Sequence, residues 1–399
     1  MVPGHHPRVI SADSKRAMFG CVGLSIIAYA GFLGMPMIVG MLVDQLGFTA
    51  PEAGYIASAE LFGIFVASIV TSAIVNKVNR RWIMVAGLAF CIVGNIGSYA
   101  IQDFVPLLVA RFATGVSAGS VYATAVAILA GSNETARNFT YLIFSIAFSN
   151  AIILYTFPIL GGHVGIAGVY VLLASLAATG FFLIRFVPEL YEERAAQTSN
   201  EASDSRKHYP TSLSFVCLAA VFSFYFMAGA YWAYMERIGV DLGNTPEFVG
   251  KYIAIGTLFS LIGCGLAYWL SRRVGLSKPL LLSLFCVSIC LLLFGANIST
   301  IFFIIATAII FLFWNAIDIY QLGTLANLDH TGRFCALTPA SQGLGMAAGP
   351  AVAAYLLDHG SGYSIVPYLG SLATFVAFLL YVYVYARLRR IDPVVADQG

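Results

Sequence analysis

The chain has 399 residues, of which 59% are hydrophobic and only 10% are charged, with a formal net charge of +2 at pH 7. Soluble domains carry about 25% charged residues, so this composition excludes an ordinary soluble protein and predicts an all-α membrane protein. No long basic run indicates nucleic acid as a partner.

Seven cysteines are spread along the chain, each inside or at the edge of an apolar run. They show no CxxC spacing and no paired spacing in polar loops, so we expect neither disulfides nor a zinc site. The chain also lacks the phosphate-binding pattern GxxxxGK[ST]. These observations predict no metal and no cofactor, and they disfavour an enzyme or an ATP-driven pump.

A helix needs about 20 apolar residues to cross the hydrocarbon core of a bilayer. After the polar residues 1–16, the chain contains a series of such segments, the first of which is too long for a cleaved signal peptide. We therefore predict a multi-pass protein of a cell membrane with twelve transmembrane helices. The predicted segments are 17–43, 53–75, 82–102, 104–131, 138–161, 165–187, 212–237, 246–271, 279–297, 299–327, 334–357 and 363–386.

One long polar stretch, PELYEERAAQTSNEASDSRKHYPTS, separates the sixth segment from the seventh. Its composition is that of a linker. We therefore divide the chain into an N-terminal six-helix bundle (1–187), a linker (188–211) and a C-terminal six-helix bundle (212–399).

The second half of the chain repeats the first. Gly250 matches Gly54 at an offset of 196 residues (250 minus 54). Two parallel six-helix halves related in this way are typical of secondary transporters, whose halves rock around a site near the bilayer midplane. At the same offset Asp318 corresponds to Tyr122, which makes that tyrosine a candidate for the same site.

The basic residues predict the orientation of the chain, because loops rich in Lys and Arg stay in the cytoplasm. Of the 21 lysines and arginines, all but Arg111, Arg237 and Lys251 fall in the termini, the linker or loops on one side of the predicted membrane. Both termini and the linker are therefore predicted to be cytoplasmic.

The loop between the second and third segments reads SAIVNKVNRR, residues 72–81. It resembles the G-x-L-A-D-R-x-G-R-K loop of the major facilitator superfamily, with Lys77, Arg80 and Arg81 as its basic residues. Asn76 stands where the family has an aspartate that pairs with cytoplasmic arginines and locks one conformation. An amide can take over only a weaker hydrogen bond in that role.

Further motifs of the same family lie in the later segments. RFATG in the fourth segment resembles the family's R-x-x-x-G element. ILYTFPILGG in the fifth resembles the antiporter signature G-x-x-x-G-P-x-x-G-G without its leading glycines, and GMAAGPAVAA in the eleventh repeats it. Small residues of this kind let helices pack closely and slide. The resemblance gives a conformational role to Pro158, Gly161, Gly345, Gly349 and Pro350.

The resemblance covers essentially the whole chain and implies the family's fold of two six-helix bundles. GMPMIVGMLVDQLGF in the first segment is similar to the drug- and sugar-efflux branches of the family. The resemblance further implies a monomer, a bacterial inner membrane, and a central cavity lined by the first, fourth, seventh and tenth helices.

Asp318 lies in the middle of an uncharged run in the tenth segment. A buried carboxylate is costly unless it is compensated, and Arg111 lies roughly 16 Å away in depth, too far for a salt bridge. Burial without a cation favours the neutral form of a carboxyl. Asp318 is therefore either a proton-coupling site or a counter-ion for a cationic substrate. The alternative is a protonated side chain that only bonds a neighbouring helix.

Arg111 in the fourth segment must also find a partner within the membrane. Glu60 in the second segment lies at a similar depth and is the expected one. The pair belongs either to the coupling machinery, as the family resemblance implies, or to a purely structural ion pair.

Aromatic and amide side chains recur at helical spacing in the first, seventh and tenth segments. An aromatic and amide lining suits a flat or amphipathic organic solute, although packing alone also explains single aromatics. The candidates for the solute cavity are Tyr29, Phe32, Tyr122, Tyr225, Trp232, Glu236, Trp314, Asn315 and Gln321.

The sequence therefore predicts a secondary active transporter that couples protons to a small organic solute, with export slightly favoured. The first alternative is an importer of an organic acid or a sugar-like metabolite, with Arg111 binding the anion. The second is a receptor or enzyme on a transporter-like scaffold.

Overall fold

The computed structural model describes residues 13–188, 209–297, 299–329 and 333–392, so that most of the predicted linker lies outside the described residues. The described residues are helical, with no β-strand among them. The helices are α1 (Lys15–Leu33), α2 (Met35–Leu46), α3 (Ala50–Ile74), α4 (Arg80–Ala100), α5 (Phe104–Ala130), α6 (Thr135–Ile184), α7 (Thr211–Asp241), α8 (Pro246–Val274), α9 (Ser277–Ala296), α10 (Thr300–Leu328), the 3₁₀ helix η1 (Cys335–Leu337), α11 (Thr338–Asp358) and α12 (Ile365–Ile391).

Local sequence fixes where several helices begin. Thr49 and Glu52 form a capping box at α3, in which Glu52 N–H donates to Thr49 Oγ1 at 3.3 Å and Thr49 N–H donates to the Glu52 carboxylate at 2.9 Å. At α8, Thr245 Oγ1 accepts a hydrogen bond from Phe248 N–H, and Pro246 follows Thr245. A proline in the first turn costs no hydrogen bond, so these short polar sequences separate apolar helices cleanly.

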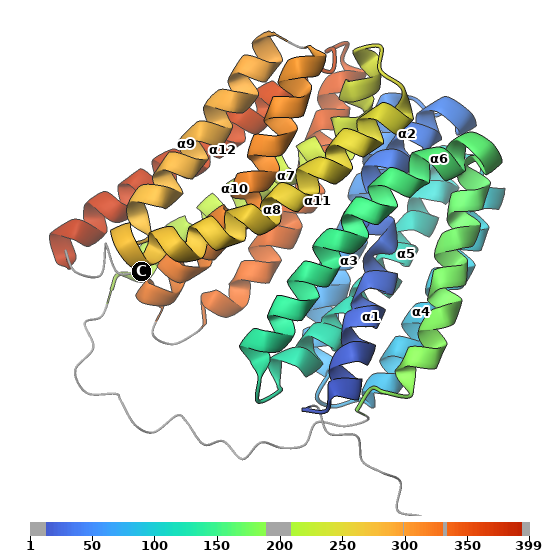
Figure 1. Cartoon of the computed structure of the whole chain (residues 1–399), viewed down its shortest axis with the longest axis horizontal. Coiled ribbons are helices and arrows are strands. Elements are labelled where there is room, and N and C mark those ends of the chain that lie inside the picture. Colours follow the sequence, from blue (N-terminus) through green and yellow to red (C-terminus); the bar gives the residue numbers. More distant parts are fainter. Residues whose placement is uncertain (1–12, 189–208, 298, 330–332, 393–399) are drawn as a thin grey trace, which may run out of the picture.

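Ten helices of the described chain are long and apolar enough to cross a membrane. One of them, α6, has 50 residues, which as a straight helix would measure about 75 Å, more than twice the thickness of the hydrocarbon core. Figure 1 shows instead that α6 turns back on itself. The predicted segments 138–161 and 165–187 are the two arms of this one element, while α11 is not among the ten.

The turn in α6 lies at Gly165, whose φ of 70° and ψ of 180° are open only to glycine. Gln45 on α2 bridges it: Gln45 Nε2 donates to Gly161 O at 3.0 Å, and Gln45 Oε1 accepts from Ile166 N–H at 2.6 Å. The side chain therefore satisfies backbone groups on both sides of the turn.

The predicted first segment, 17–43, is interrupted rather than continuous. α1 ends and α2 begins at Gly34. Only glycine fits there, because the Phe157 ring of α6 occupies the space where a Cβ would lie. Pro36 in the first turn of α2 also lacks the N–H that a continuous helix would use. The two pieces together form one candidate span.

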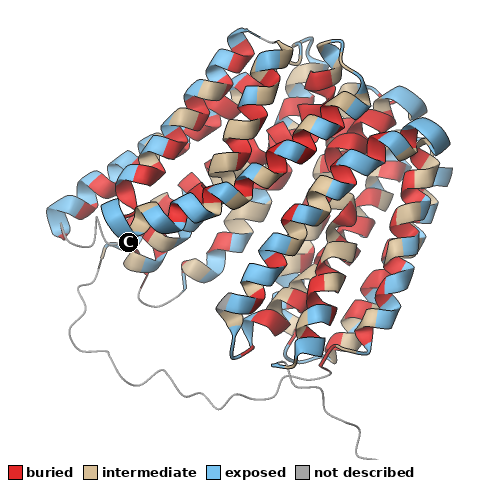
Figure 2. Ribbon diagram, in the orientation of Figure 1, coloured by how far each residue is buried: buried red, intermediate tan, exposed pale blue. Residues whose placement is uncertain are grey.

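Figure 1 shows helices α1–α6, the N-half, gathered on one side and α7–α12, the C-half, on the other. Buried residues concentrate where helices face one another, and exposed residues lie on the outer faces (Figure 2). Many exposed residues are large and apolar, such as Phe90, Phe182 and Ile301. In water such a surface would be unfavourable, so it is the surface expected to face lipid.

The two halves contact each other through α2 with α7, α3 with α11, and α6 with α8. Tyr234 on α7 donates to Ala50 O at the start of α3 at 3.0 Å, and Ser58 on α3 donates to Ala347 O on α11 at 2.6 Å. In Figure 1 α2 lies at the end of the molecule opposite to the start of α1 and the end of α12, the side called here that of the termini. The halves are therefore joined at the end away from the termini, which we call the closed end.

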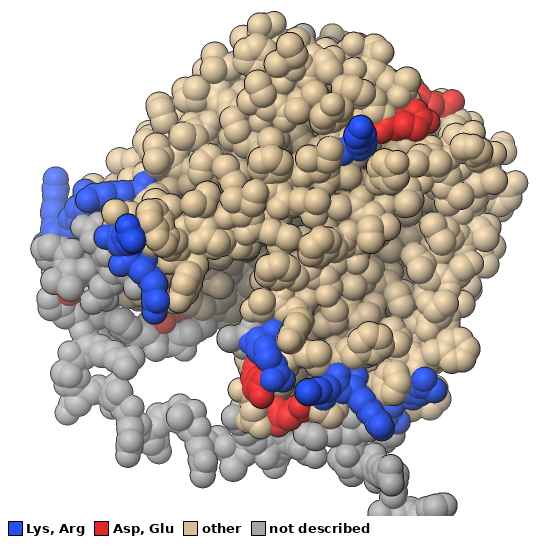
Figure 3. All heavy atoms as spheres, in the orientation of Figure 1, with Lys and Arg blue, Asp and Glu red and all other residues tan. Residues whose placement is uncertain are grey.

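Charged side chains are nearly absent from the body of the face shown in Figure 3, and basic ones gather at the edge where the chain ends lie. The last turns of α8 and α12 supply Arg272, Arg273, Arg389 and Arg390. This face thus has a nearly uncharged body with basic side chains along one edge.

Candidate functional site

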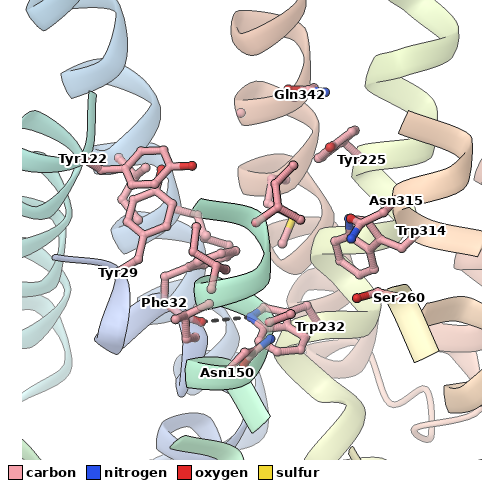
Figure 4. A pocket seen from close by; sticks show the side chains of 18 of the residues that line it. Tyr29, Phe32, Tyr122, Asn150, Tyr225, Trp232, Ser260, Trp314, Asn315 and Gln342 are labelled. Carbon is pink, nitrogen blue, oxygen red and sulfur yellow. Dashed lines mark hydrogen bonds between the residues drawn. The ribbon is translucent and has the colours of Figure 1, made fainter. Parts of the chain in front are cut away.

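A cavity of about 410 Å³ lies between the two halves, with walls from both of them (Figure 4). The helices α1, α3, α5 and α6 contribute from the N-half and α7, α8, α10 and α11 from the C-half. Seven of the nine predicted cavity residues lie in its wall: Tyr29, Phe32, Tyr122, Tyr225, Trp232, Trp314 and Asn315.

Aromatic rings form two facing walls of the cavity. In the N-half, the rings of Tyr29 and Tyr122 are stacked, with centroids 3.6 Å apart and an interplanar angle of 13°. In the C-half, Phe311 and Trp314 are stacked at 5.9 Å and 11°, and Trp232 meets both rings edge-on at 6.0 and 6.4 Å. Stacked rings present flat faces that can hold another flat group or a cation.

Trp232 also connects the two halves at the cavity. Its indole Nε1 donates to Phe32 O at 3.1 Å, the bond drawn dashed in Figure 4, and the two rings lie 6.1 Å apart. Breaking contact between the halves at this point exposes an unpaired indole N–H, so the bond favours the closed arrangement.

The polar groups of the wall are neutral. Asn150, Asn315, Gln342, Thr257 and Ser260 offer amides and hydroxyls, and no Lys, Arg, His, Asp or Glu of the described residues lines the cavity. Asn150 Oδ1 is buried without a hydrogen-bond partner among the described residues. An unpaired buried acceptor is costly, so this oxygen is a natural contact for a donor on a bound solute.

Asp318 lies next to the wall and is half-buried. Its Oδ1 accepts a hydrogen bond of 2.6 Å from Nε2 of Gln342, and its carboxyl also interacts with Tyr225. Both partners line the cavity, whereas Asp318 itself does not. Within the described chain no basic side chain is paired with this carboxyl, which agrees with the absence of a cation inferred from helix depth.

Glu60 and Arg111 form the expected ion pair between α3 and α5. Arg111 Nη2 and Nε donate to Glu60 Oε1 and Oε2 at 2.6 and 3.1 Å, and Arg111 Nη1 donates to Asn95 Oδ1 at 2.9 Å. The Tyr170 ring lies 5.5 Å from the guanidinium. Arg111 is only 1% exposed and lies outside the cavity wall. In this arrangement Glu60 and Asn95 accept hydrogen bonds from the Arg111 guanidinium, which does not contact the cavity, so the geometry does not favour an anionic solute bound by Arg111.

Glu236 lies in a charged cluster at the closed end rather than in the cavity wall. Arg237 Nε donates to Glu236 Oε2 at 2.7 Å, and the same guanidinium donates through Nη1 and Nη2 to the two carboxylate oxygens of Asp44 on α2, at 2.7 Å each. Helical spacing placed Glu236 on the face of Trp232, but its neighbour Arg237 draws it into an ion pair that bridges the halves.

Gln321 also lies outside the cavity wall. It is 1% exposed on α10, and both polar atoms of its amide lack hydrogen-bond partners among the described residues. Helical spacing from Asp318 placed Gln321 on the same face, but the residue is packed inside the C-half, where a solute in the cavity cannot touch it.

Two basic residues of the loop between α3 and α4, Arg80 and Arg81, make hydrogen bonds within the N-half. Arg80 is buried and donates to Asn76 Oδ1 at 3.2 Å, so the amide that replaces the family's acid still pairs with an arginine. Arg81 Nε donates to Val187 O, just after α6, at 2.8 Å. Lys77 is exposed. The loop thus braces the N-half on the side of the termini.

Close helix approaches explain the predicted conformational glycines and prolines. Within the C-half, a Cβ on Gly345 would lie 2.5 Å from Phe222 O, and one on Gly349 would overlap Phe226 O of α7. Pro350 follows inside α11. Between the halves, Pro158 of α6 packs against Gly250 of α8. Gly161 lies against Met41 of α2 next to the turn in α6.

Sequence reasoning missed Gln342, Asn150 and Asp44. An amide in the first turns of α11 and one in the middle of the first arm of α6 are the signals that could have identified the first two. Asp44 lies one residue beyond the predicted end of the first segment, so the cost of burying a charge gives no reason to seek a partner for it.

Comparison with solved structures finds proteins of the same overall shape. The nucleoside transporter NupG superposes with a TM-score of 0.70 at 11% identity, covering 92% of this chain and 99% of that one. The POT family transporter PepTSo gives 0.74 at 10% identity, covering 95% and 99%. A D-xylose-proton symporter gives 0.70 at 13% identity, covering 90% and 96%. At such identities the likeness concerns the fold alone.

A search of curated proteins finds no match. The family model of the Major Facilitator Superfamily, in contrast, matches residues 20–327, which is more than half of the chain. This match agrees with the helical fold and with the shape of the solved transporters. The chain therefore belongs to the Major Facilitator Superfamily.

Proposed function

We propose that this protein is a secondary active transporter that moves a small organic solute by alternating access. Twelve crossings, counting α6 twice and α11 once, give each half six helices that tilt about the cavity between them. The observation that carries the proposal is the cavity itself, which is walled by both halves and lies between elements joined by contacts such as Trp232 with Phe32 O and Tyr234 with Ala50 O. The family match supports a transporter over a receptor or an enzyme.

Orientation follows from charge. The basic edge lies where the termini lie (Figure 3), and positive residues stay cytoplasmic, so the termini face the cytoplasm and the closed end faces outward. In this proposal the protein is a monomer in a cell membrane, which in a bacterium is the inner membrane, and the arrangement described here is its inward-facing state.

Proton coupling is assigned to Asp318. The side chain is an acid within the membrane, without a basic partner among the described residues, and two residues of the cavity wall contact it. Such a group can take up a proton from one side and release it to the other as access alternates. Glu60 and Arg111 hold α3 and α5 together during this movement.

Export is the favoured direction, on the strength of the efflux-like sequences in the first and fifth predicted segments. Import by proton symport is the second candidate. It is supported by the similar fold of the D-xylose-proton symporter.

A transport assay tests both coupling and direction. A thermal-shift screen of the purified protein against metabolites and drugs identifies solutes that bind the folded state. Transport of each such solute is then measured in proteoliposomes with an imposed pH gradient of either sign. We expect transport to follow the gradient in the wild type and to lose that dependence in Asp318→Asn.

The matched control is Asp103→Asn, an exposed acid at the start of α5 whose side chain makes no capping bond. It is expected to behave like the wild type. Full gradient-driven transport by Asp318→Asn would remove the coupling role, and the sign of the effective gradient separates export from import.

A further inference from the structure

We propose that the transported solute is a planar organic molecule bearing N–H donors, cationic or neutral but not anionic, and that Gln342 links its binding to the proton on Asp318. This inference rests on the proposed transport function and adds to it the solute class and the residue that connects solute to proton.

Gln342 is placed to contact both the solute and Asp318. It projects from α11 into the cavity wall, close to Tyr225 in the view of Figure 4, while its Nε2 donates to Asp318 Oδ1 at 2.6 Å. No hydrogen bond within the described chain occupies its Oε1. Gln342 and Tyr225 are the two cavity-wall residues that contact the carboxyl of Asp318, which is itself half-buried.

The protonation state of Asp318 determines whether Gln342 and Tyr225 present hydrogen-bond acceptors or donors to the cavity. An ionised carboxylate only accepts hydrogen bonds, so it holds the Gln342 N–H and the Tyr225 hydroxyl hydrogen and leaves oxygen acceptors facing the cavity. A protonated carboxyl donates its own O–H, which Gln342 Oε1 can accept if the amide turns over. The amide N–H groups then face the cavity instead.

The hydrogen-bonding character of the wall therefore reverses with the proton on Asp318. A solute with N–H donors binds best to the ionised form and so expels the proton to the water, which gives exchange of solute for proton and agrees with export. A solute with only acceptors would bind best to the protonated form and would travel with the proton. The chemistry of the solute and the direction of transport are thus linked.

The remaining wall restricts the solute further. The stacked pairs Tyr29 with Tyr122 and Phe311 with Trp314 offer flat faces on opposite sides. With no basic residue among the described lining, an anionic solute would be repelled by the ionised Asp318 and would find no positive charge to compensate it. A cation gains instead from the rings and from the nearby carboxylate. Asn150 Oδ1 adds a further free acceptor.

The other titratable groups around Asp318 do not change this reasoning. They are Tyr122 on α5, Tyr225 on α7, Cys264 on α8 and Tyr381 on α12, all of which interact electrostatically with its carboxyl. None of them carries a positive charge in either protonation state. Asp318 is consequently the group whose ionisation decides the charge next to the cavity.

Three probes of one shape test the solute class: 2-naphthamidine, which is a cation with N–H donors, 2-naphthamide, which is neutral, and 2-naphthoate, which is an anion. Binding to the purified full-length protein is measured by calorimetry, and proton release is measured with a pH dye in weakly buffered solution. We expect affinity to fall from the amidine to the amide, with no binding of the carboxylate, and proton release when the amidine binds.

Gln342→Leu tests the link to the proton. It is expected to lower the affinity for the amidine and the amide roughly tenfold, the worth of about one hydrogen bond, and to reduce the proton release that accompanies binding. Tyr225→Phe, which keeps the ring, is expected to reduce both effects in part. Gln102→Leu, an exposed glutamine between α4 and α5, is the matched control and is expected to match the wild type.

The outcomes separate this inference from the proposed function. Wild-type protein that binds none of the probes, or binds the carboxylate as well as the amidine, overturns the solute class while leaving Asp318-dependent transport of other solutes intact. Unchanged proton release in folded Gln342→Leu overturns the role of Gln342. Wild-type transport that does not follow the pH gradient, with probe binding and proton release as expected, counts against the proposed function alone.

Discussion

Arg237 on α7 bonds to Asp44 on α2 through both of its Nη groups, at 2.7 Å each, and thereby joins the C-half to the N-half at the closed end. The same guanidinium is held from the other side by Glu236, which is 2% exposed. The Asp44 side chain is 46% exposed and the Arg237 side chain is 5% exposed, so water reaches the cluster mainly at Asp44, the partner from the other half. The cluster is therefore arranged to open without leaving a buried charge unpaired.

Asp44→Asn is expected to shift the protein toward separation of the halves at the closed end without unfolding it. A half-exposed ion pair contributes about 1 kcal/mol, which corresponds to roughly a fivefold change in the ratio of the two states. Distances between spin labels placed after α2 and after α7 measure the shift. Asp241→Asn, an exposed acid in the last turn of α7, serves as the control. An unchanged distance distribution in Asp44→Asn would show that the pair does not hold the closed end.

Glu60 and Arg111 are expected to depend on each other for stability. Glu60→Gln leaves the Arg111 charge, 1% exposed, without its partner, and Arg111→Gln leaves the Glu60 charge, 4% exposed, without its partner. Each single replacement is expected to lower the unfolding free energy by about 3–5 kcal/mol. The double variant should lose much less than the sum of the two. Denaturant unfolding of all four proteins in detergent gives the coupling energy, and strict additivity would contradict a direct interaction.

This pair shows what sequence could establish. Glu60 and Arg111 fall at matching depth in segments that run in the same direction, and two opposite charges in an apolar medium have few other partners, so burial energetics alone predicted the contact. The same reasoning isolated Asp318. In each case the cost of burying a charge leaves few alternatives.

The partners of Asp318 could not be predicted in this way. Gln342 is neutral, so no comparable energy ties it to a particular neighbour, and its contact depends on how α11 is rotated against α10. The errors at Glu236 and Gln321 have a related cause. Helical spacing gives the face of a helix but not which neighbour covers that face, and in both cases the covering neighbour is protein rather than cavity.

Gly349→Ala is expected to be destabilising because α11 lies against α7 at this point. The added Cβ would overlap Phe226 O and come within 2.6 Å of Ala230 N, and backbone atoms cannot yield as a flexible side chain can. Overpacking of this kind costs about 1–3 kcal/mol. Gly97→Ala is the matched control, since nothing lies within 4 Å of its Cβ position on α4, and it should be neutral or slightly stabilising. Equal melting temperatures of the two variants in detergent would contradict the close packing of α7 and α11.

Gln45→Leu is expected to weaken the turn in α6 specifically. The leucine keeps the size of the side chain but leaves Gly161 O and Ile166 N–H without the partners they have in the wild type, at 3.0 and 2.6 Å. Unpaired backbone groups cost about 1–3 kcal/mol each when water cannot replace the bond. Gly165→Ala strains the same turn by a different route, since alanine must then adopt a φ of 70° with ψ of 180°.

Hydrogen exchange at residues 161–168 distinguishes a local effect of these two variants from a global one. Both should accelerate exchange there, while the α7–α11 contact keeps its protection. Gln102→Leu controls for the loss of an amide at an exposed site. Protection that falls evenly over the whole chain in Gln45→Leu would mean that Gln45 supports the packing of α2 rather than the reversal of α6, because a bond across a turn acts first on the turn.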